Sequence, residues 1–201
     1  MRFDLIDFAV FDVHLLKRTK AQTDYLEDVL EQADERMRAL NDEQAAALAR
    51  NITAGLPGST ESWTLDDVRA CLVDYEGMGP ETLGDHLIAF LEEVVPVAEE
   101  LGLRLCCHPD DPPFPLLGLP RVVSSLDDYV AVLDAIDSPA NGATFCTGSL
   151  GVRAAFDPVA FVEKLGHRIH FVHLRNTRRD MRDTGLRVSF EESAHLAGDT
   201  D

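Results

Sequence analysis

The sequence predicts an α/β fold that forms part of a (β/α)8 TIM barrel, with a helical insertion around residues 17–80. Short apolar runs at 103–107, 143–146 and 169–173 are typical of buried strands, and helical spacing of apolar residues lies between them. Parallel strands need such crossover helices. The sequence contains no GxGxxG turn, which favours a barrel over an open doubly wound sheet.

The N-terminal elements come first. Residues 5–16 form a continuous apolar run rich in Phe and Val, and they predict a strand. Helical spacing follows from about 23 to 51, and the Gly- and Pro-containing stretch at 55–59 ends it. Thr64 is expected to cap the next helix, because two aspartates follow it in the first turn. Since no strand pattern interrupts these helices, they constitute the predicted insertion.

The remaining elements alternate between helix and strand. The expected order is a helix at 83–101 ended by Gly102, a strand at 103–107, a proline-dense loop at 108–121, a helix capped by Ser124 that runs to about Ile136, a strand at 143–146, a helix begun by Asp157 and ended by Gly166, and a strand at 169–173. Residues 174–201 are expected to add no buried strand. Four strands are thus predicted where a closed barrel needs eight. We therefore expect one incomplete barrel domain over residues 1–201.

Charge limits the partners of the protein. Eighteen Lys and Arg stand against thirty-six Asp and Glu, a net charge of −18. Such a field repels phosphate backbones, so nucleic acid is not expected as a partner. Lysine occurs only at Lys17, Lys20 and Lys164, and Asp outnumbers Glu. This composition favours a salt-adapted source, and an ordinary acidic cytosolic protein is the alternative.

The four cysteines (Cys71, Cys106, Cys107 and Cys146) are too few for a disulfide framework in 201 residues, and no CxxC occurs. We therefore expect a reducing, cytoplasmic location. No apolar stretch approaches the length of a membrane span, and the N-terminus lacks a signal-peptide pattern. Neither secretion nor membrane insertion is expected.

Three side chains share one topological position. His108 follows the strand at 103–107, Cys146 ends the next strand, and His173 ends the one after. The carboxyl ends of barrel strands face one cavity, so these side chains are expected to converge. A thiolate and two imidazoles suit a divalent transition metal such as iron, manganese or zinc. Each residue alone is more often a core cysteine or a hydrogen-bonded histidine, but three at equivalent positions favour a metal site.

Neighbouring loops carry further candidates. Asp110 and Asp111 either orient the ligand imidazole or cap turns, and both alternatives stay open. The small-residue turn after Cys146, which includes Ser149 and Arg153, either brings backbone N–H groups near a ligand or is an ordinary loop. Arg175 either binds a substrate carboxylate or pairs with a local acid. His195, in a polar tail, is a weaker candidate for the same cavity.

Nine segments of this sequence closely resemble mannonate dehydratase of the hexuronate-degradation pathway: Phe8–Phe11, Asn51–Gly58, His108–Pro113, Gly118–Arg121, Ala140–Gly142, Cys146–Ser149, Gly151–Arg153, His173–Arg175 and His195–Asp199. The resemblance implies a metal-dependent, xylose-isomerase-like barrel that dehydrates D-mannonate to 2-dehydro-3-deoxy-D-gluconate. It also implies Fe2+ or Mn2+ held by His, Cys, His and a later Asp. The first three ligands match His108, Cys146 and His173.

The sequence departs from the family pattern at both ends. Family members carry an additional N-terminal stretch and a C-terminal Arg-Pro-Asp-His-Gly-like motif, which supplies the fourth ligand and acid–base groups, and Asp199 and Asp201 do not match it. We therefore expect a fragment of the enzyme with little or no activity alone. The alternatives are a metal-dependent sugar isomerase or epimerase on the same barrel, and a non-catalytic remnant or a subunit completed by another copy or a complementing chain.

Overall fold

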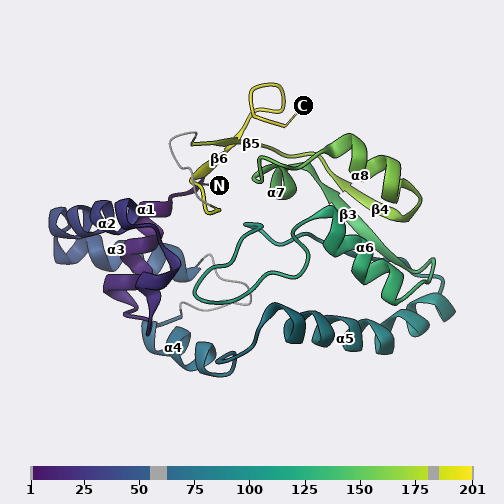
Figure 1. Ribbon diagram of the computed structural model, residues 1–201, viewed down its shortest axis with the longest axis horizontal. Helices are drawn as coiled ribbons and strands as arrows, with labels where there is room; N and C mark the ends of the chain where they lie inside the picture. Colours follow the sequence, from purple (N-terminus) through teal and green to yellow (C-terminus); the bar gives the residue numbers. More distant parts are fainter. Residues whose placement is uncertain (1, 55–62, 181–185, 201) are drawn as a thin grey trace.

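The structure is a computed structural model that describes residues 2–54, 63–180 and 186–200. Two groups of elements lie side by side in Figure 1: N-terminal helices, and a three-stranded parallel sheet covered by helices. The long loop between β2 and α6, drawn in teal, lies between the two groups. The expected break at residues 55–59 lies outside the described residues. Within them, no helix is long and apolar enough to cross a membrane.

The parallel sheet has the strand order β2-β3-β4, with β2 at Leu105–Cys107, β3 at Asn141–Cys146 and β4 at Ile169–His173. Three of the four predicted strands are confirmed, and their order in the sheet follows the chain. Every residue of β3 is buried, whereas β2 and β4 are edge strands in the described part of the chain. The register pairs Cys146 with His173, so the carboxyl ends of these two strands are level.

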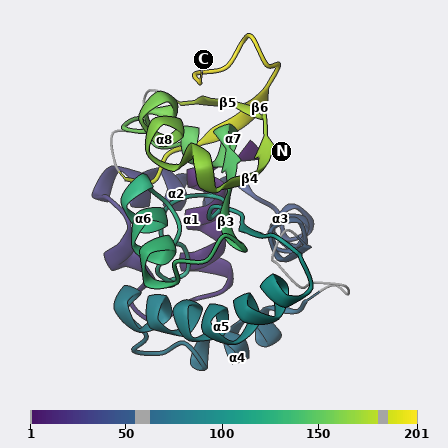
Figure 2. The same cartoon turned by 90° about the vertical axis from the view of Figure 1, so that its right-hand side faces the viewer.

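Three helices cover this sheet, and they follow one another along it in Figure 2: α5 at Pro80–Glu100, α6 at Leu126–Ala135 and α8 at Pro158–Leu165. Tyr129 and Leu133 of α6 pack with Phe145 of β3 and Phe161 of α8 in the main hydrophobic cluster. As expected, Gly102 follows α5 with a φ of 66°, a conformation that favours glycine, and Asp157 caps α8. Ser125 rather than the expected Ser124 caps α6, because its side chain accepts from Asp128 N.

The expectation of a strand over residues 5–16 is wrong. The segment forms α1 at Leu5–Ala9, which continues as a π-helix at Val10–Leu15. Asp4 caps α1 by accepting from the backbone N–H groups of Ile6 and Asp7. Phe8 and Phe11 pack in one hydrophobic cluster and Leu5 and Val10 in another. Because both sides are covered, the apolar run lacks the alternation that would distinguish a buried helix from a buried strand.

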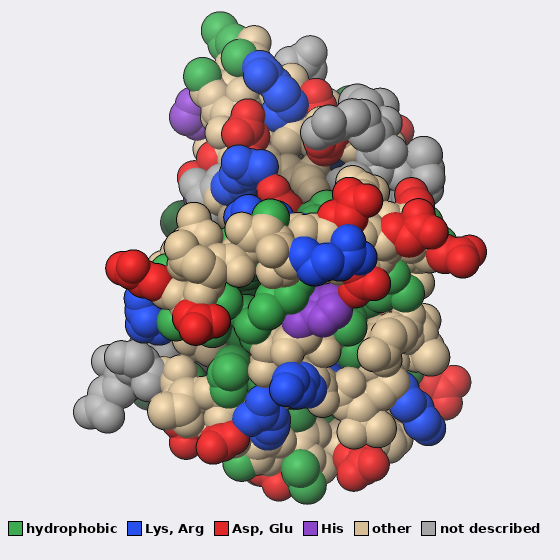
Figure 3. Space-filling view, turned by 90° about the vertical axis from the view of Figure 1, so that its left-hand side faces the viewer, with side chains coloured by type: hydrophobic (Ala, Val, Ile, Leu, Met, Phe, Trp, Pro, Cys, Tyr) green, Lys and Arg blue, Asp and Glu red, His purple; other side chains and the backbone are tan. Residues whose placement is uncertain are grey.

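The remaining N-terminal elements are helical in the described residues, as expected: a 3-10 helix at Ala21–Asp24, α2 at Glu27–Ala39, α3 at Asp42–Ala54 and α4 at Leu65–Val73. Thr64 caps α4 as expected, in a capping box with Asp67. Hydrogen bonding from Thr64, first through its hydroxyl and then through its backbone N–H, lowers the pKa of Asp67. Acidic and basic side chains are scattered among apolar and other side chains on the face shown in Figure 3.

The expectation that residues 174–201 add no buried strand is also wrong. Strands β5 at Asn176–Arg179 and β6 at Phe190–Ser193 form an antiparallel sheet with β1 at Arg2–Phe3, in the order β1-β6-β5. Phe190 is buried and stacks on Phe3, while Thr177 is buried and donates to the Gly148 carbonyl in the short helix α7 at Thr147–Gly151. These strands are too short and polar for a period-two pattern, and their partners lie far away in the sequence.

Candidate metal centre

His108, Cys146 and His173 meet at the carboxyl end of the parallel sheet. Their ligand atoms all lie within 4.8 Å of one another, and Cys146 Sγ is 3.5 Å from His173 Nδ1. Two ligands at about 2.3 Å and 2.1 Å from one tetrahedral ion lie about 3.6 Å apart. The three residues that the sequence brings to one cavity are therefore close enough to hold one cation.

The strands account for this convergence. Cys146 ends the central strand β3 and is fully buried, whereas the two histidines, one just after β2 and one at the end of β4, are exposed on either side. Parallel strands in adjacent register end at the same edge of the sheet. The site is thus open on the side of the imidazoles and closed behind the sulfur.

The hydrogen bonds around the three residues suit metal ligation. The Nδ1 of His108 lies 2.8 Å from the carbonyl oxygen of Pro109, which can only accept, so Nδ1 carries the hydrogen and Nε2 keeps its lone pair. The Cys146 sulfur accepts from the backbone N–H of Ser149 at 3.4 Å and lies 3.3 Å from its hydroxyl. The thiolate is the form of cysteine that binds metals.

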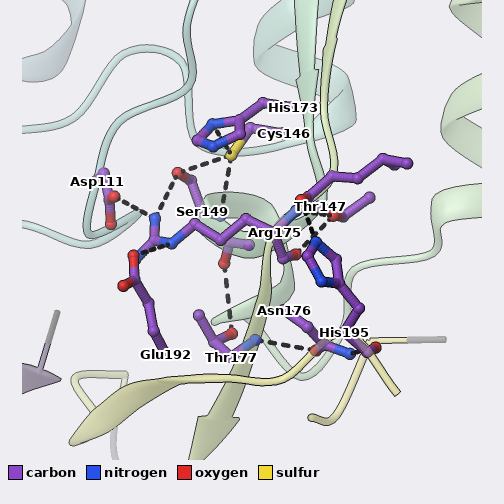
Figure 4. Close-up of polar contacts among 12 residues, drawn as sticks. Asp111, Cys146, Thr147, Ser149, His173, Arg175, Asn176, Thr177, Glu192 and His195 are labelled. Carbon is purple, nitrogen blue, oxygen red and sulfur yellow. Dashed lines mark hydrogen bonds and ion pairs between the residues drawn. The ribbon is translucent and has the colours of Figure 1, made fainter. Parts of the chain in front are cut away.

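Arg175 lies beside this cluster and is almost buried, with 9% of its side chain exposed. Its Nη1 lies 2.5 Å from Asp111 Oδ2 and 3.5 Å from Ser149 Oγ, and its Nε lies 2.9 Å from Glu192 Oε1. Its Nη2 is buried and has no hydrogen-bond partner in the described part of the chain. Figure 4 shows the guanidinium between Asp111 and Glu192, next to Cys146. One donor edge of a paired cation is thus left for a further acceptor.

Comparisons with known proteins show the family of this chain. A sequence model of D-mannonate dehydratase (UxuA) matches residues 8–201. The chain belongs to the D-mannonate dehydratase family. It is 52% identical over 201 residues to the mannonate dehydratase of Rhizobium meliloti and to mannonate dehydratase 1 of Agrobacterium fabrum. Each alignment covers all of this chain and 50% of the relative, so the chain spans about half the length of these relatives.

A solved structure of the family supports the same conclusion. The crystal structure of mannonate dehydratase from Streptococcus suis serotype 2 aligns with a TM-score of 0.62 and 32% sequence identity. The alignment covers 76% of this chain and 42% of that chain. The α/β arrangement described above is therefore that of a D-mannonate dehydratase family member.

The two aspartates that follow the first histidine have different positions. Asp110 fixes the loop after β2: its Oδ2 accepts from the backbone N–H groups of Val122 and Val123 and from the Ser124 hydroxyl. Asp111 instead pairs with Arg175. The structure gives His108 Nδ1 a different partner, the Pro109 carbonyl. Asp110 therefore stabilises the loop, as the turn-capping alternative expects. Asp111 neither orients the His108 imidazole nor caps a turn, because it pairs with Arg175.

The other sequence candidates lie farther from the cluster. Arg153 lines a separate cavity, which is described below. The Nε2 of His195 lies 3.0 Å from the Leu174 carbonyl, and Asn176 donates to the backbone carbonyl of His195, which ties the tail to β5. Figure 4 places the His195 ring away from Cys146 and His173. Arg175 pairs with local acids, as one of its alternatives expects, and its binding of a substrate carboxylate stays a prediction.

Sequence reasoning missed three residues that position Arg175. Glu192 reaches it from β6, and Thr147 binds its backbone in both directions, donating to its carbonyl and accepting from its N–H. Gly148 leaves room for its aliphatic stem, since a Cβ there would overlap the Cβ, Cγ and Cδ of Arg175. Gly148 could have indicated a close approach of another side chain. Nothing in the sequence indicated the role of Glu192, because its strand was not predicted.

Proposed function

We propose that this chain supplies the metal-binding half of a mannonate dehydratase active site, which converts D-mannonate to 2-dehydro-3-deoxy-D-gluconate in hexuronate degradation. The observation that carries the proposal is the convergence of His108, Cys146 and His173 in a member of this family. Two imidazoles and one thiolate suit Fe2+ or Mn2+, the metals that the resemblance implies. Such an ion supplies Lewis-acid stabilisation of the negative charge that develops on substrate oxygen.

The residues of this chain would hold the ion and orient the substrate. The Ser149 N–H donates to the Cys146 sulfur and helps to position it, and the Pro109 carbonyl fixes the His108 ring. Arg175 lies beside the site, its buried Nη2 has no hydrogen-bond partner among the described residues, and a guanidinium suits a sugar carboxylate. We propose Arg175 and Ser149 as substrate contacts, because both lie beside the cluster.

We further propose that the parallel sheet is one part of a xylose-isomerase-like (β/α)8 barrel, in a single domain. Phe171, Val172 and Leu174 at the β4 edge are 58%, 49% and 63% exposed. Parallel sheets are normally covered on both faces, and open apolar edges promote association. We propose that additional polypeptide, from a complementing chain or another copy, covers this edge and supplies the fourth ligand and the acid–base groups.

The cysteines and the charge of the chain indicate the cellular environment that we propose for it. Four free cysteines and the acidic composition support a reducing cytoplasmic location and a salt-adapted source. A series of unfolding measurements at increasing salt tests the second point, since a salt-adapted protein gains stability as salt screens its net charge of −18. Maximal stability in dilute buffer would contradict salt adaptation.

The activity itself is tested with D-mannonate and Fe2+ or Mn2+. The 201-residue chain is assayed alone and together with a polypeptide that spans the rest of the relatives' length, with aldose interconversion measured in parallel. We expect little or no dehydration by the chain alone and dehydration by the mixture. A mixture that interconverts aldoses without dehydrating mannonate would overturn the proposed reaction. Turnover by the chain alone at about 1–1000 s⁻¹ would overturn the need for additional groups.

A further inference from the structure

A second site lies apart from the cysteine and histidine cluster. A cavity of about 530 Å3 opens between the loop after β2 and the start of α5, and its walls include Pro80, Pro113, Pro115 and Pro120. Proline fixes the backbone of these walls. The volume is within the range of pockets that hold small metabolites, about 300–1,000 Å3.

Three arginines from separate segments line this cavity: Arg121 at the end of the loop, Arg153 after the short helix α7 (Thr147–Gly151), and Arg187 before β6. The chain as a whole carries a charge of −18. A group of guanidinium ions in one cavity therefore departs from the general charge of the protein. Arginine forks match carboxylate and phosphate oxygens, which gives such a group a specific use.

The arginines are held by neutral backbone oxygens rather than by carboxylates. Arg121 Nε donates to the Phe114 carbonyl at 3.1 Å, and Arg187 donates to the carbonyls of Pro115 and Asp24. The Arg153 side chain forms no hydrogen bond or ion pair with the described residues. The hydrogen bonds of this residue come from its backbone. Burial lowers the pKa of Arg121, against the weaker effect of Asp110 and Asp111. These cations thus remain poorly neutralised.

The two acids that line the cavity already have other partners. Asp24 Oδ2 lies 2.6 Å from Arg18 Nη2, and Asp128 Oδ2 accepts from the Ser124 N–H at 2.8 Å. Their charge is directed to those groups, and no ion pair links them to the three arginines among the described residues. A cavity with three cations and two engaged carboxylates favours an incoming anion.

We propose that this cavity binds the oxyanion group of a small metabolite, a carboxylate or a phosphate, through Arg121, Arg153 and Arg187. The site is separate from the metal centre, and the proposal does not depend on the proposed reaction. Arg153 supplies the unengaged guanidinium, and Arg121 and Arg187 are held in place by the backbone carbonyls of the surrounding loops.

Binding is tested on the full chain after treatment with a chelator, so that anions cannot bind through a metal ion. Inorganic phosphate and gluconate are titrated separately at constant ionic strength, and saturable shifts of the arginine Nε–H NMR signals report binding. Comparing the two probes distinguishes a phosphate site from a carboxylate site. Arg153→Gln and Arg121→Gln are compared with Arg38→Gln, which removes the same charge from an exposed position on α2.

We expect at least one probe to bind and its Kd to rise about tenfold or more in Arg153→Gln and Arg121→Gln, the effect of losing one charge-assisted hydrogen bond. Arg38→Gln should leave Kd unchanged, and gluconate binding that only Arg175→Gln weakens would belong to the site beside the metal centre. The proposal is overturned if neither probe saturates, if Arg38→Gln weakens binding as much as Arg153→Gln, or if only Arg175→Gln weakens it. If Arg121→Gln fails to fold, Arg153→Gln alone tests the proposal, because the Arg153 side chain has no partner among the described residues that the substitution would remove.

Discussion

Cys146 Sγ lies 3.5 Å from His173 Nδ1, although 27 positions separate the two residues in the chain. The parallel register of β3 and β4 brings them together. His108 completes the group from the far side of β3, its ring centroid 5.8 Å from that of His173. The spacing of the ligands therefore follows from the sheet, because the ends of adjacent parallel strands hold the three residues.

Removing one ligand should weaken metal binding. We expect His108→Ala, Cys146→Ala and His173→Ala to lower the affinity for Co2+, a spectroscopic substitute, by a factor of about ten or more, because each removes one of three donor atoms. Equilibrium dialysis measures the affinity. His86→Ala, at an exposed position of α5, is the control. Equal affinity in all four variants would contradict the site.

The cysteines should differ in their reactivity toward a thiol-alkylating reagent. Cys71 and Cys106 are exposed and should react first. Cys107 should react slowly, because burial, and to a lesser extent Asp110 and Cys106, raises the pKa of its thiol and so lowers the thiolate fraction. Buried Cys146 should react slowly and be protected further by metal. Peptide mapping by mass spectrometry measures each rate, and metal protection of Cys106 instead of Cys146 would place the ligand elsewhere.

Gly148→Ala should destabilise the protein. The new Cβ would overlap the aliphatic stem of Arg175, so the free energy of unfolding should fall by about 1–3 kcal/mol. Gly84→Ala in α5 is the matched control, because a Cβ there meets nothing within 4 Å. That change should raise the free energy of unfolding by about 0.5–1 kcal/mol, since alanine favours helix. Urea unfolding measures both, and equal effects would contradict the close approach of Arg175.

The buried ion pair between Asp12 and Arg18 should contribute more to the free energy of unfolding than an exposed ion pair does. Asp12 is fully buried and accepts from Arg18 at 2.8 Å and from the Tyr25 hydroxyl at 2.9 Å. Asp12→Asn should lower the free energy of unfolding by about 1–3 kcal/mol, because it removes the buried carboxylate that Arg18 and Tyr25 share, while Arg18 keeps its ion pair with Asp24. Asp66→Asn, which breaks an exposed pair with Arg69, should change it by about 0–1 kcal/mol. Similar losses in both variants would show that Asp12 is not buried in solution.

The parallel half of the fold could be predicted because its signals are local. The strands at 103–107, 143–146 and 169–173 are short apolar runs between helices, and Thr64 and Asp157 precede helices as good N-caps do. The prediction for residues 5–16 was wrong, because an apolar run that is covered on both sides can be either a buried helix or a buried strand. The strands β5 and β6 were not predicted, because four residues each are too few to show a periodic pattern.

The metal ligands could be predicted from their shared position, whereas the surroundings of the site could not. Strand ends are visible in the sequence, so His108, Cys146 and His173 could be grouped. The partner of Arg175 on β6 and the position of Arg153 in a separate cavity depend on how loops pack. Loop packing follows from contacts between distant residues, which spacing in the sequence does not reveal.

The central claim is that one sulfur and two imidazole nitrogens bind the same ion. X-ray absorption spectroscopy of the chain loaded with one equivalent of Fe2+ tests it most directly. The account predicts one sulfur at about 2.3 Å and two nitrogens with the multiple scattering of imidazole at about 2.1 Å, with the sulfur lost in Cys146→Ala. A first shell of oxygen and nitrogen without sulfur would contradict it.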